Sequence, residues 1–190
     1  MLKKITLLLV GIAMGFAQFT WAAGNPEKGK SLYAVCVACH GADGAGNKAL
    51  NSPRIAGQEI WYLERQLKNF KTGVRGANSK DVYGMQMRPM AMTLPNDQAI
   101  ADVAAYVNGL KAKPPVSKIK GDTSAGKAAY MICQTCHGAN GEGNKALNAP
   151  KLINQQDWYM VRQLKGFKEG LRGTHPKDVY GMQMRPMSMT

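Results

Sequence analysis

The feature that most constrains this chain is a five-residue motif, Cys-x-x-Cys-His, that occurs at residues 36–40 and again at residues 133–137. This motif is the attachment signature of c-type haem. Two thiols at this spacing can form thioethers to the vinyl groups of one porphyrin, and the histidine that follows can bind its iron. All four cysteines of the chain lie in the two motifs. The sequence therefore predicts two covalently attached haem c groups, held by Cys36, Cys39, Cys133 and Cys136, with His40 and His137 as iron ligands.

Other uses of paired cysteines fit less well. A zinc site of the paired-cysteine kind usually separates its pairs by about 12 to 20 residues, whereas 93 residues lie between Cys39 and Cys133. A thioredoxin-like redox pair needs a βαβ context, and no β-branched strand runs flank either motif. Structural disulfides would not need a histidine directly after each pair. Zinc and disulfides are kept as the alternatives.

Residues 1–22 have the features of a secretory signal peptide. Lys3 and Lys4 form a basic start, residues 5–19 are largely apolar, and small residues precede a cleavage point expected after Ala22, with Ala23 as the alternative. The apolar run is shorter than the roughly 20 residues that a membrane span needs. The sequence therefore predicts an exported, periplasmic protein with a cleaved signal.

The chain is strongly basic, with a formal charge of +13 that falls to +11 without Lys3 and Lys4. A basic surface favours encounter with acidic redox partner proteins. It equally serves solubility and offsets haem propionates, and it is compatible with peripheral association with a membrane. No nucleic-acid recognition motif is present, so nucleic acid is not an expected partner.

An internal repeat sets the expected domain count. When the sequence is shifted by 97 residues, residues 41–93 align with residues 138–190 without a gap, and 35 of 53 positions are identical. We predict a signal peptide at residues 1–22 and a first domain at residues 23–112. A linker at residues 113–121 then leads to a second domain of the same kind at residues 122–190. Domains this small need the haem as part of their core.

The local patterns predict an all-α protein. Asn25 and Pro26 open a helix that continues into Cys36. Apolar periodicity and caps predict further helices at residues 59–71, 96–110, 124–133 and 157–168, with loops at residues 41–56 and 73–88. The second copy lacks a counterpart of residues 96–110. Either the sequence is a fragment of a longer chain, which we expect, or another chain covers the second haem.

The order of these features resembles class I cytochrome c. The tandem arrangement, with a Trp-Tyr-x-x-Arg-Gln-Leu helix and a Met-x-x-Met element in each copy, is similar to the di-haem cytochrome c4 family. The resemblance implies two tandem class I cytochrome c domains, each of a few short helices around a covalent haem, the second lacking its final helix.

The resemblance also implies the second axial ligands. Each copy has four methionines, and counting back from Leu94 as the family does selects Met87, hence Met184 in the repeat. Met90 and Met187, which each follow a proline, are the alternatives, and most of the eight methionines are expected to be core filler. A His–Met pair stabilises ferrous iron and raises the potential.

Residues around the haem are implied in the same way. The carbonyls of Pro53 and Pro150 are expected to accept the second N–H of each axial histidine. Candidate donors to the haem propionates, which could equally be packing residues, are Trp61, Tyr62, Arg65, Trp158, Tyr159 and Arg162. His175 is expected to face solvent.

The function predicted is that of a di-haem electron carrier, not an enzyme, which moves electrons in the periplasm between a respiratory donor and a terminal oxidase or reductase. One alternative is a di-haem peroxidase with one open iron site. Copper binding by the methionine-rich segments is another. A third is the cytochrome subunit of a larger oxidoreductase complex.

Overall fold

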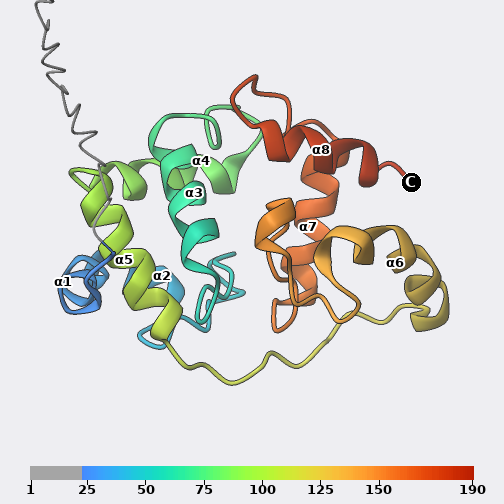
Figure 1. The fold of residues 1–190 in the computed structure, drawn as a ribbon, viewed down its shortest axis with the longest axis horizontal. Helices are drawn as coiled ribbons and strands as arrows, with labels where there is room; N and C mark the ends of the chain where they lie inside the picture. Colours follow the sequence, from blue (N-terminus) through green and yellow to red (C-terminus); the bar gives the residue numbers. More distant parts are fainter. Residues whose placement is uncertain (1–22) are drawn as a thin grey trace, which may run out of the picture.

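The computed structural model describes residues 23–190, and within them it contains eight α-helices, one short 3-10 helix and no extended strands (Figure 1). The predicted signal peptide and its cleavage point after Ala22 lie outside the described residues. The helices are α1 Pro26–Leu32, α2 Ala34–His40, α3 Ile60–Lys71, α4 Val82–Met92, α5 Asp97–Gly109, α6 Thr123–His137, α7 Asp157–Lys168 and α8 Val179–Met187, and the 3-10 helix is Lys145–Leu147. None of the described helices is long and apolar enough to cross a membrane. The all-α fold predicted from the sequence is confirmed.

The first helical segment begins as expected and then breaks. The Asn25 side chain accepts hydrogen bonds from the backbone N–H groups of Glu27 and Lys28, at 2.9 and 3.1 Å, and Pro26 occupies the first turn. The sequence predicted one continuous helix into Cys36, which is wrong, because α1 ends before Tyr33 and α2 starts after it. At this break the N–H of Cys36 donates to the carbonyl of Tyr33, three residues earlier, at 2.8 Å, which is a 3-10 bond in place of an α-helical one.

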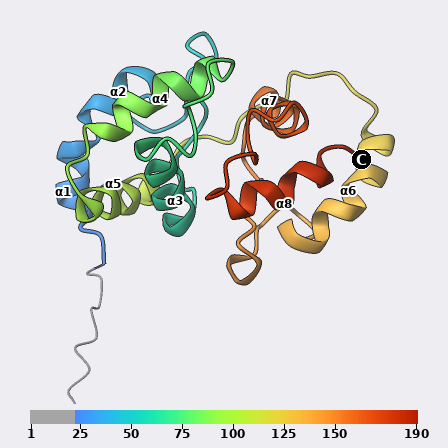
Figure 2. The ribbon, with the colours of Figure 1, turned by 90° about the horizontal axis from the view of Figure 1, so that it is seen from above.

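The core of the first domain forms around α5. This helix packs against α1 and α3 (Figure 2). Gly29 permits the close approach to α1, because a Cβ there would collide with the backbone of Asp102. The buried cluster consists of Tyr33, Leu63, Leu94, Ala99, Ile100, Val103, Ala104 and Val107. The apolar stripe expected on residues 96–110 is therefore buried, apart from Leu110, which is only partly buried.

The segment predicted as a loop at residues 73–88 is partly helical, since α4 begins at Val82 and α8 occupies the matching place in the second copy. The side chain of Asp81 caps α4 by accepting the N–H of Gly84 at 3.0 Å, and Asp178 caps α8 in the same way. Gly84 and Pro89 both disfavour helix interiors. Here α4 accommodates Pro89 near its end and buries Gly84.

The two domains lie side by side, with α3 and α7 between them and an extended linker joining them (Figure 1). The contacts between them repeat with the two copies exchanged. Arg65 donates to Asn148 Oδ1 and to its carbonyl, at 3.0 and 2.9 Å, and Arg162 donates to Asn51 Oδ1 and its carbonyl, at 3.2 and 2.8 Å. Each pair of partners is related by the 97-residue shift. The domains are therefore related by an approximate two-fold axis.

A second exchanged set of contacts lies at the same interface. Arg75 donates to Gln66 at 2.5 Å and to Gln163 at 3.4 Å. Its repeat partner Arg172 donates to Gln163 and, at 3.5 Å, to Gln66. Both guanidinium groups are buried, with exposed fractions of 7% and 9%. Burial and the neighbouring charge of Arg172 lower the pKa of Arg75.

Candidate haem-binding sites

Each motif places its reactive side chains on one helix face. Cys36, Cys39 and His40 stand at positions i, i+3 and i+4 of α2, which share a face of an α-helix. The second motif ends α6 with the same spacing. None of the four cysteines is in a disulfide, and burial raises the pKa of the Cys36 thiol to about 11. Both thiols and the imidazole of each copy can thus meet one porphyrin.

The two histidines are buried and oriented in the same way. His40 and His137 have exposed fractions of 5% and 6%. Nδ1 of His40 lies 2.8 Å from the carbonyl oxygen of Pro53, and Nδ1 of His137 lies 2.7 Å from that of Pro150, as the resemblance implied. A carbonyl can only accept, so Nδ1 carries the proton and the lone pair of Nε2 is free to bind a metal.

The environment of His40 favours the neutral ring that a ligand must have. Burial lowers its pKa, and the hydrogen bond to Pro53 opposes this only in part. The turn after each histidine is closed by a glycine with positive φ, Gly41 at 79° and Gly138 at 83°. That turn lets the following loop fold back under the ring.

The eight methionines in α4, in α8 and just after α8 differ in exposure. Met87 and Met184 are partly buried. The other six are exposed, by 41% to 57%: Met85, Met90, Met92, Met182, Met187 and Met189. The expectation that most of the eight methionines are core filler is therefore wrong. The two partly buried methionines occupy the same place in the repeat, and they are the pair that the resemblance selected.

Buried donors without acceptors fit a group that brings carboxylates. Within residues 23–190, the indole N–H of Trp61 is buried and has no hydrogen-bond partner, and the same holds for the Nε atoms of Arg75, Arg88, Arg172 and Arg185. Unpaired buried donors are costly. Haem propionates would supply acceptors of this kind, so the residues present fit haem. By contrast, no three His, Cys, Asp or Glu side chains in the described part of the chain could together hold a metal ion.

Two of the expected propionate donors have another role. Arg65 and Arg162 bind the opposite domain, and their guanidinium groups lie 4.3 Å from the ring centroids of Tyr180 and Tyr83 of that domain. Neither the sequence pattern nor the resemblance predicted this interface, although the repeat itself was the available signal. His175 is partly buried, and its Nδ1 accepts the N–H of Lys177 at 3.1 Å.

Comparison with known proteins agrees with this geometry. The Cytochrome c family model matches residues 26–111 and 123–190. Cytochrome c4 of Azotobacter vinelandii is 37% identical over 178 residues, which cover 88% of this chain and 82% of that protein. The thiosulfate dehydrogenase electron acceptor of Thiomonas intermedia is 33% identical over 190 residues, covering 93% and 80%.

A solved structure gives the same result for the fold. Reduced cytochrome c4 from Pseudomonas stutzeri superposes with a TM-score of 0.70 at 33% identity, over 88% of this chain and 91% of that one. The match extends over both domains of this chain. Each of the two Cys-x-x-Cys-His motifs of this chain attaches one haem c. The chain therefore belongs to the cytochrome c family, among the di-haem cytochromes c4.

Proposed function

We propose that this protein is a periplasmic electron carrier that takes electrons from a respiratory donor and delivers them to a terminal oxidase or reductase. Bound haem supplies the Fe(III)/Fe(II) couple. The observation that best supports this role is the equivalence of the two sites, each with a buried histidine bonded to a proline carbonyl. Residues that hold both sites in the same closed arrangement keep reorganisation small, which suits electron transfer.

The second axial ligands in this proposal are Met87 and Met184. They are the partly buried members of their groups, whereas Met90 and Met187 are 41% and 44% exposed. A thioether that binds iron has to point into the domain and away from water. A peroxidase would need one iron with an open position, and the matching methionines in the two copies favour closed sites in both.

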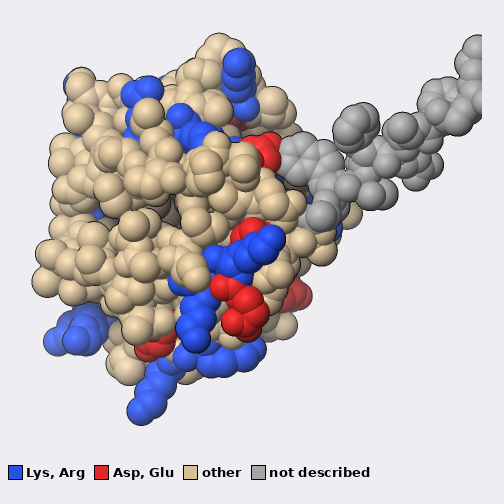
Figure 3. Space-filling model, turned by 90° about the vertical axis from the view of Figure 1, so that its left-hand side faces the viewer, with Lys and Arg blue, Asp and Glu red and all other residues tan. Residues whose placement is uncertain are grey.

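In this proposal, charge accounts for only part of how the surface binds a partner protein. On the outer face of the first domain, basic side chains outnumber acidic ones, but acidic side chains lie among them and a large part of the face is uncharged (Figure 3). An acidic partner would be attracted by the net charge and docked by uncharged surface. The Thiomonas relative is a thiosulfate dehydrogenase electron acceptor, which suggests a dehydrogenase as one class of donor.

Optical spectra of the purified holoprotein test the proposal. We expect the oxidised protein to show the weak long-wavelength band of methionine bound to Fe(III), and carbon monoxide to leave the reduced spectrum unchanged. Binding of carbon monoxide to half of the haem would contradict the electron-carrier function and favour an enzyme with one open site.

Four methionine variants test the ligands. Met87→Leu and Met184→Leu should each remove about half of the methionine–iron band and lower one midpoint potential by on the order of 100 mV, because axial ligands shift haem potentials over a wide range. Met90→Leu and Met187→Leu are the matched controls and should keep both the band and the potentials. The reverse result would assign the ligands to Met90 and Met187.

A further inference from the structure

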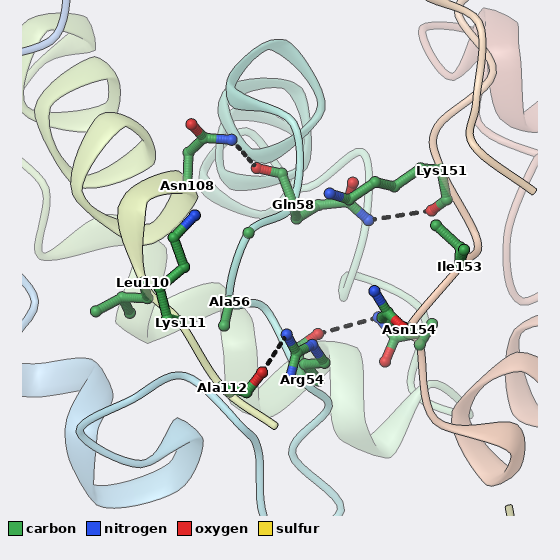
Figure 4. A pocket seen from close by; sticks show the side chains of 12 residues that line it. Arg54, Ala56, Gln58, Asn108, Leu110, Lys111, Ala112, Lys151, Ile153 and Asn154 are labelled. Carbon is green, nitrogen blue, oxygen red and sulfur yellow. Dashed lines mark hydrogen bonds between the residues drawn. The ribbon is translucent and has the colours of Figure 1, made fainter. Parts of the chain in front are cut away.

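A cavity of about 400 Å³ lies between the two domains, beside the start of the linker (Figure 4). Its lining includes four pairs of positions related by the 97-residue shift: Arg54 and Lys151, Ala56 and Ile153, Gly57 and Asn154, and Gln58 and Gln155. The remaining lining, residues 108 and 110–112, comes from the end of α5 and the residues after it. The cavity therefore lies near the approximate two-fold axis, where the same loop of each copy faces the other.

The loops around the cavity are held by hydrogen bonds that are also exchanged between the copies. Gln58 donates to the carbonyl of Lys151 at 3.3 Å, and its repeat partner Gln155 donates to the carbonyl of Arg54 at 3.0 Å. Asn108 donates to the carbonyl of Gln58 at 2.8 Å and ties α5 to this frame. The cavity walls are thus built by contacts that do not involve the lysine ammonium groups.

The charge of the lining has one sign. Arg54, Lys111 and Lys151 are cationic, and no Asp or Glu is among the lining residues. Within residues 23–190, neither the Lys111 nor the Lys151 ammonium has a hydrogen-bond or ion-pair partner, while the guanidinium of Arg54 donates to the carbonyls of Lys113 and Ala112, at 2.8 and 3.1 Å. Two carboxylates lie outside the lining: Asp43 acts electrostatically on Arg54, and Glu59 Oε2 accepts the backbone N–H of Lys151 at 3.0 Å. Several positive charges around a concave space attract anions into it.

We propose that this cavity binds a small inorganic oxyanion, phosphate or sulfate, between the two domains. The ammonium groups of Lys111 and Lys151 would donate charge-assisted hydrogen bonds to it from the first and second domain respectively. The side-chain amide of Asn154, which has no hydrogen-bond partner of its own among the described residues, would be a further donor. A ligand that bridges the domains stabilises their docked arrangement by mass action.

Isothermal titration calorimetry of the holoprotein tests this site, with sodium phosphate or sodium sulfate added at an ionic strength held constant with sodium chloride. We expect one anion bound per chain. Lys111→Gln and Lys151→Gln should each weaken binding by about tenfold, because a hydrogen bond to a charged group contributes about 1.5 kcal/mol. Lys120→Gln, an exposed linker lysine outside the cavity, removes the same charge and should leave the affinity unchanged.

Hydrogen exchange of the same proteins gives an independent readout. Phosphate should slow amide exchange in residues 54–58 and 151–155 of the wild-type chain and have no such effect in the Lys111→Gln/Lys151→Gln double variant. The proposal is overturned if no binding is detected above the chloride background. It is equally overturned if Lys120→Gln weakens binding as much as the cavity variants do, since the anion would then respond only to net charge.

Discussion

The two domains share 35 of 53 aligned residues but bury matching positions to different degrees. Tyr33 has an exposed fraction of 1%, whereas its repeat partner Tyr130 is partly exposed, although each hydroxyl donates to a glycine carbonyl at the same distance of 2.8 Å. The buried cluster lies wholly in the first domain, while Met131 and Ile132 of α6 are 60% and 50% exposed. The difference follows α5, which covers α1 and α3 and has no counterpart within residues 123–190.

The comparison shows what each part of the repeat does. Local contacts, such as the bonds from the histidines to the proline carbonyls, are the same with or without a covering helix. Apolar burial is not local, because it depends on which surface a second element removes from water. The haem motif and its loop can therefore form in both copies, while within residues 23–190 the large buried cluster forms only around α5 of the first domain.

The largest expected effect comes from the tyrosine pair. Tyr33→Ala should lower the free energy of unfolding of the first domain by about 3–5 kcal/mol, the usual cost of removing a fully buried aromatic ring. Tyr130→Ala should cost less than half as much. Hydrogen exchange of the holoproteins, resolved by domain in increasing urea, measures both. Equal losses would show that α5 does not account for the difference between the copies.

The role of α5 can be tested directly. Ile100 is fully buried in the first domain, and Ile100→Ala should destabilise that domain by about 2–5 kcal/mol. Exchange in the second domain should stay unchanged. Leu164→Ala, at a side chain of α7 that is 47% exposed, is the matched control and should cost less than about 1 kcal/mol. A loss of protection in both domains after Ile100→Ala would mean that they unfold as one unit.

The interface should behave symmetrically even though the domains do not. Arg65→Gln and Arg162→Gln each remove two hydrogen bonds and one contact with a tyrosine ring of the opposite domain. We expect each to weaken domain docking by about 1–3 kcal/mol, with the two variants agreeing closely in scanning calorimetry. A clear difference between them would show that the approximate two-fold symmetry is geometric but not energetic.

The smallest expected effect concerns the linker, whose residues 117–119 are bound to Asp157 at the start of α7. Asp157 accepts the N–H groups of Lys118 and Ile119, at 2.6 and 2.8 Å, and these bonds lower its pKa to about 2. A carboxylate whose pKa is lowered by folding stabilises the folded state. The stabilisation is complete at pH values above the pKa in the unfolded chain, about 3.9, and it is lost as the pH falls towards 2. The first copy has Ile60 at the position that matches Asp157, so it has no carboxylate there.

Limited trypsin digestion at neutral pH measures this contact. Asp157→Asn should speed cleavage after Lys118 and Lys120, while thermal unfolding changes little. Glu169→Gln, which removes an exposed carboxylate just after the same helix, should leave the cleavage rate as in the wild type. If Asp157→Asn is cleaved no faster than this control, the carboxylate does not hold the linker.

Much of the fold could be predicted because its signals lie close together in the chain. The caps at Asn25 and Asn96, the apolar spacing of α3 and the bounds of α7 depend on residues within a few positions of one another. The break at Tyr33 could not be found in this way, since it accompanies burial of the ring under α5. Local propensity does not indicate α4 either, because Gly84 and Pro89 both disfavour helix interiors, and α4 forms in spite of them.

The sequence by itself determined the chemistry of this protein: two thiol pairs, each followed by a histidine, in two copies of one unit. These features are covalent and local, so the order of residues is enough to define them. Only the tertiary structure decided that Arg65 and Arg162 join the domains, that α5 gives one copy a core, and that three cations surround a cavity between the copies. Those features depend on which distant surfaces meet, and a pattern of neighbouring residues contains no information about that.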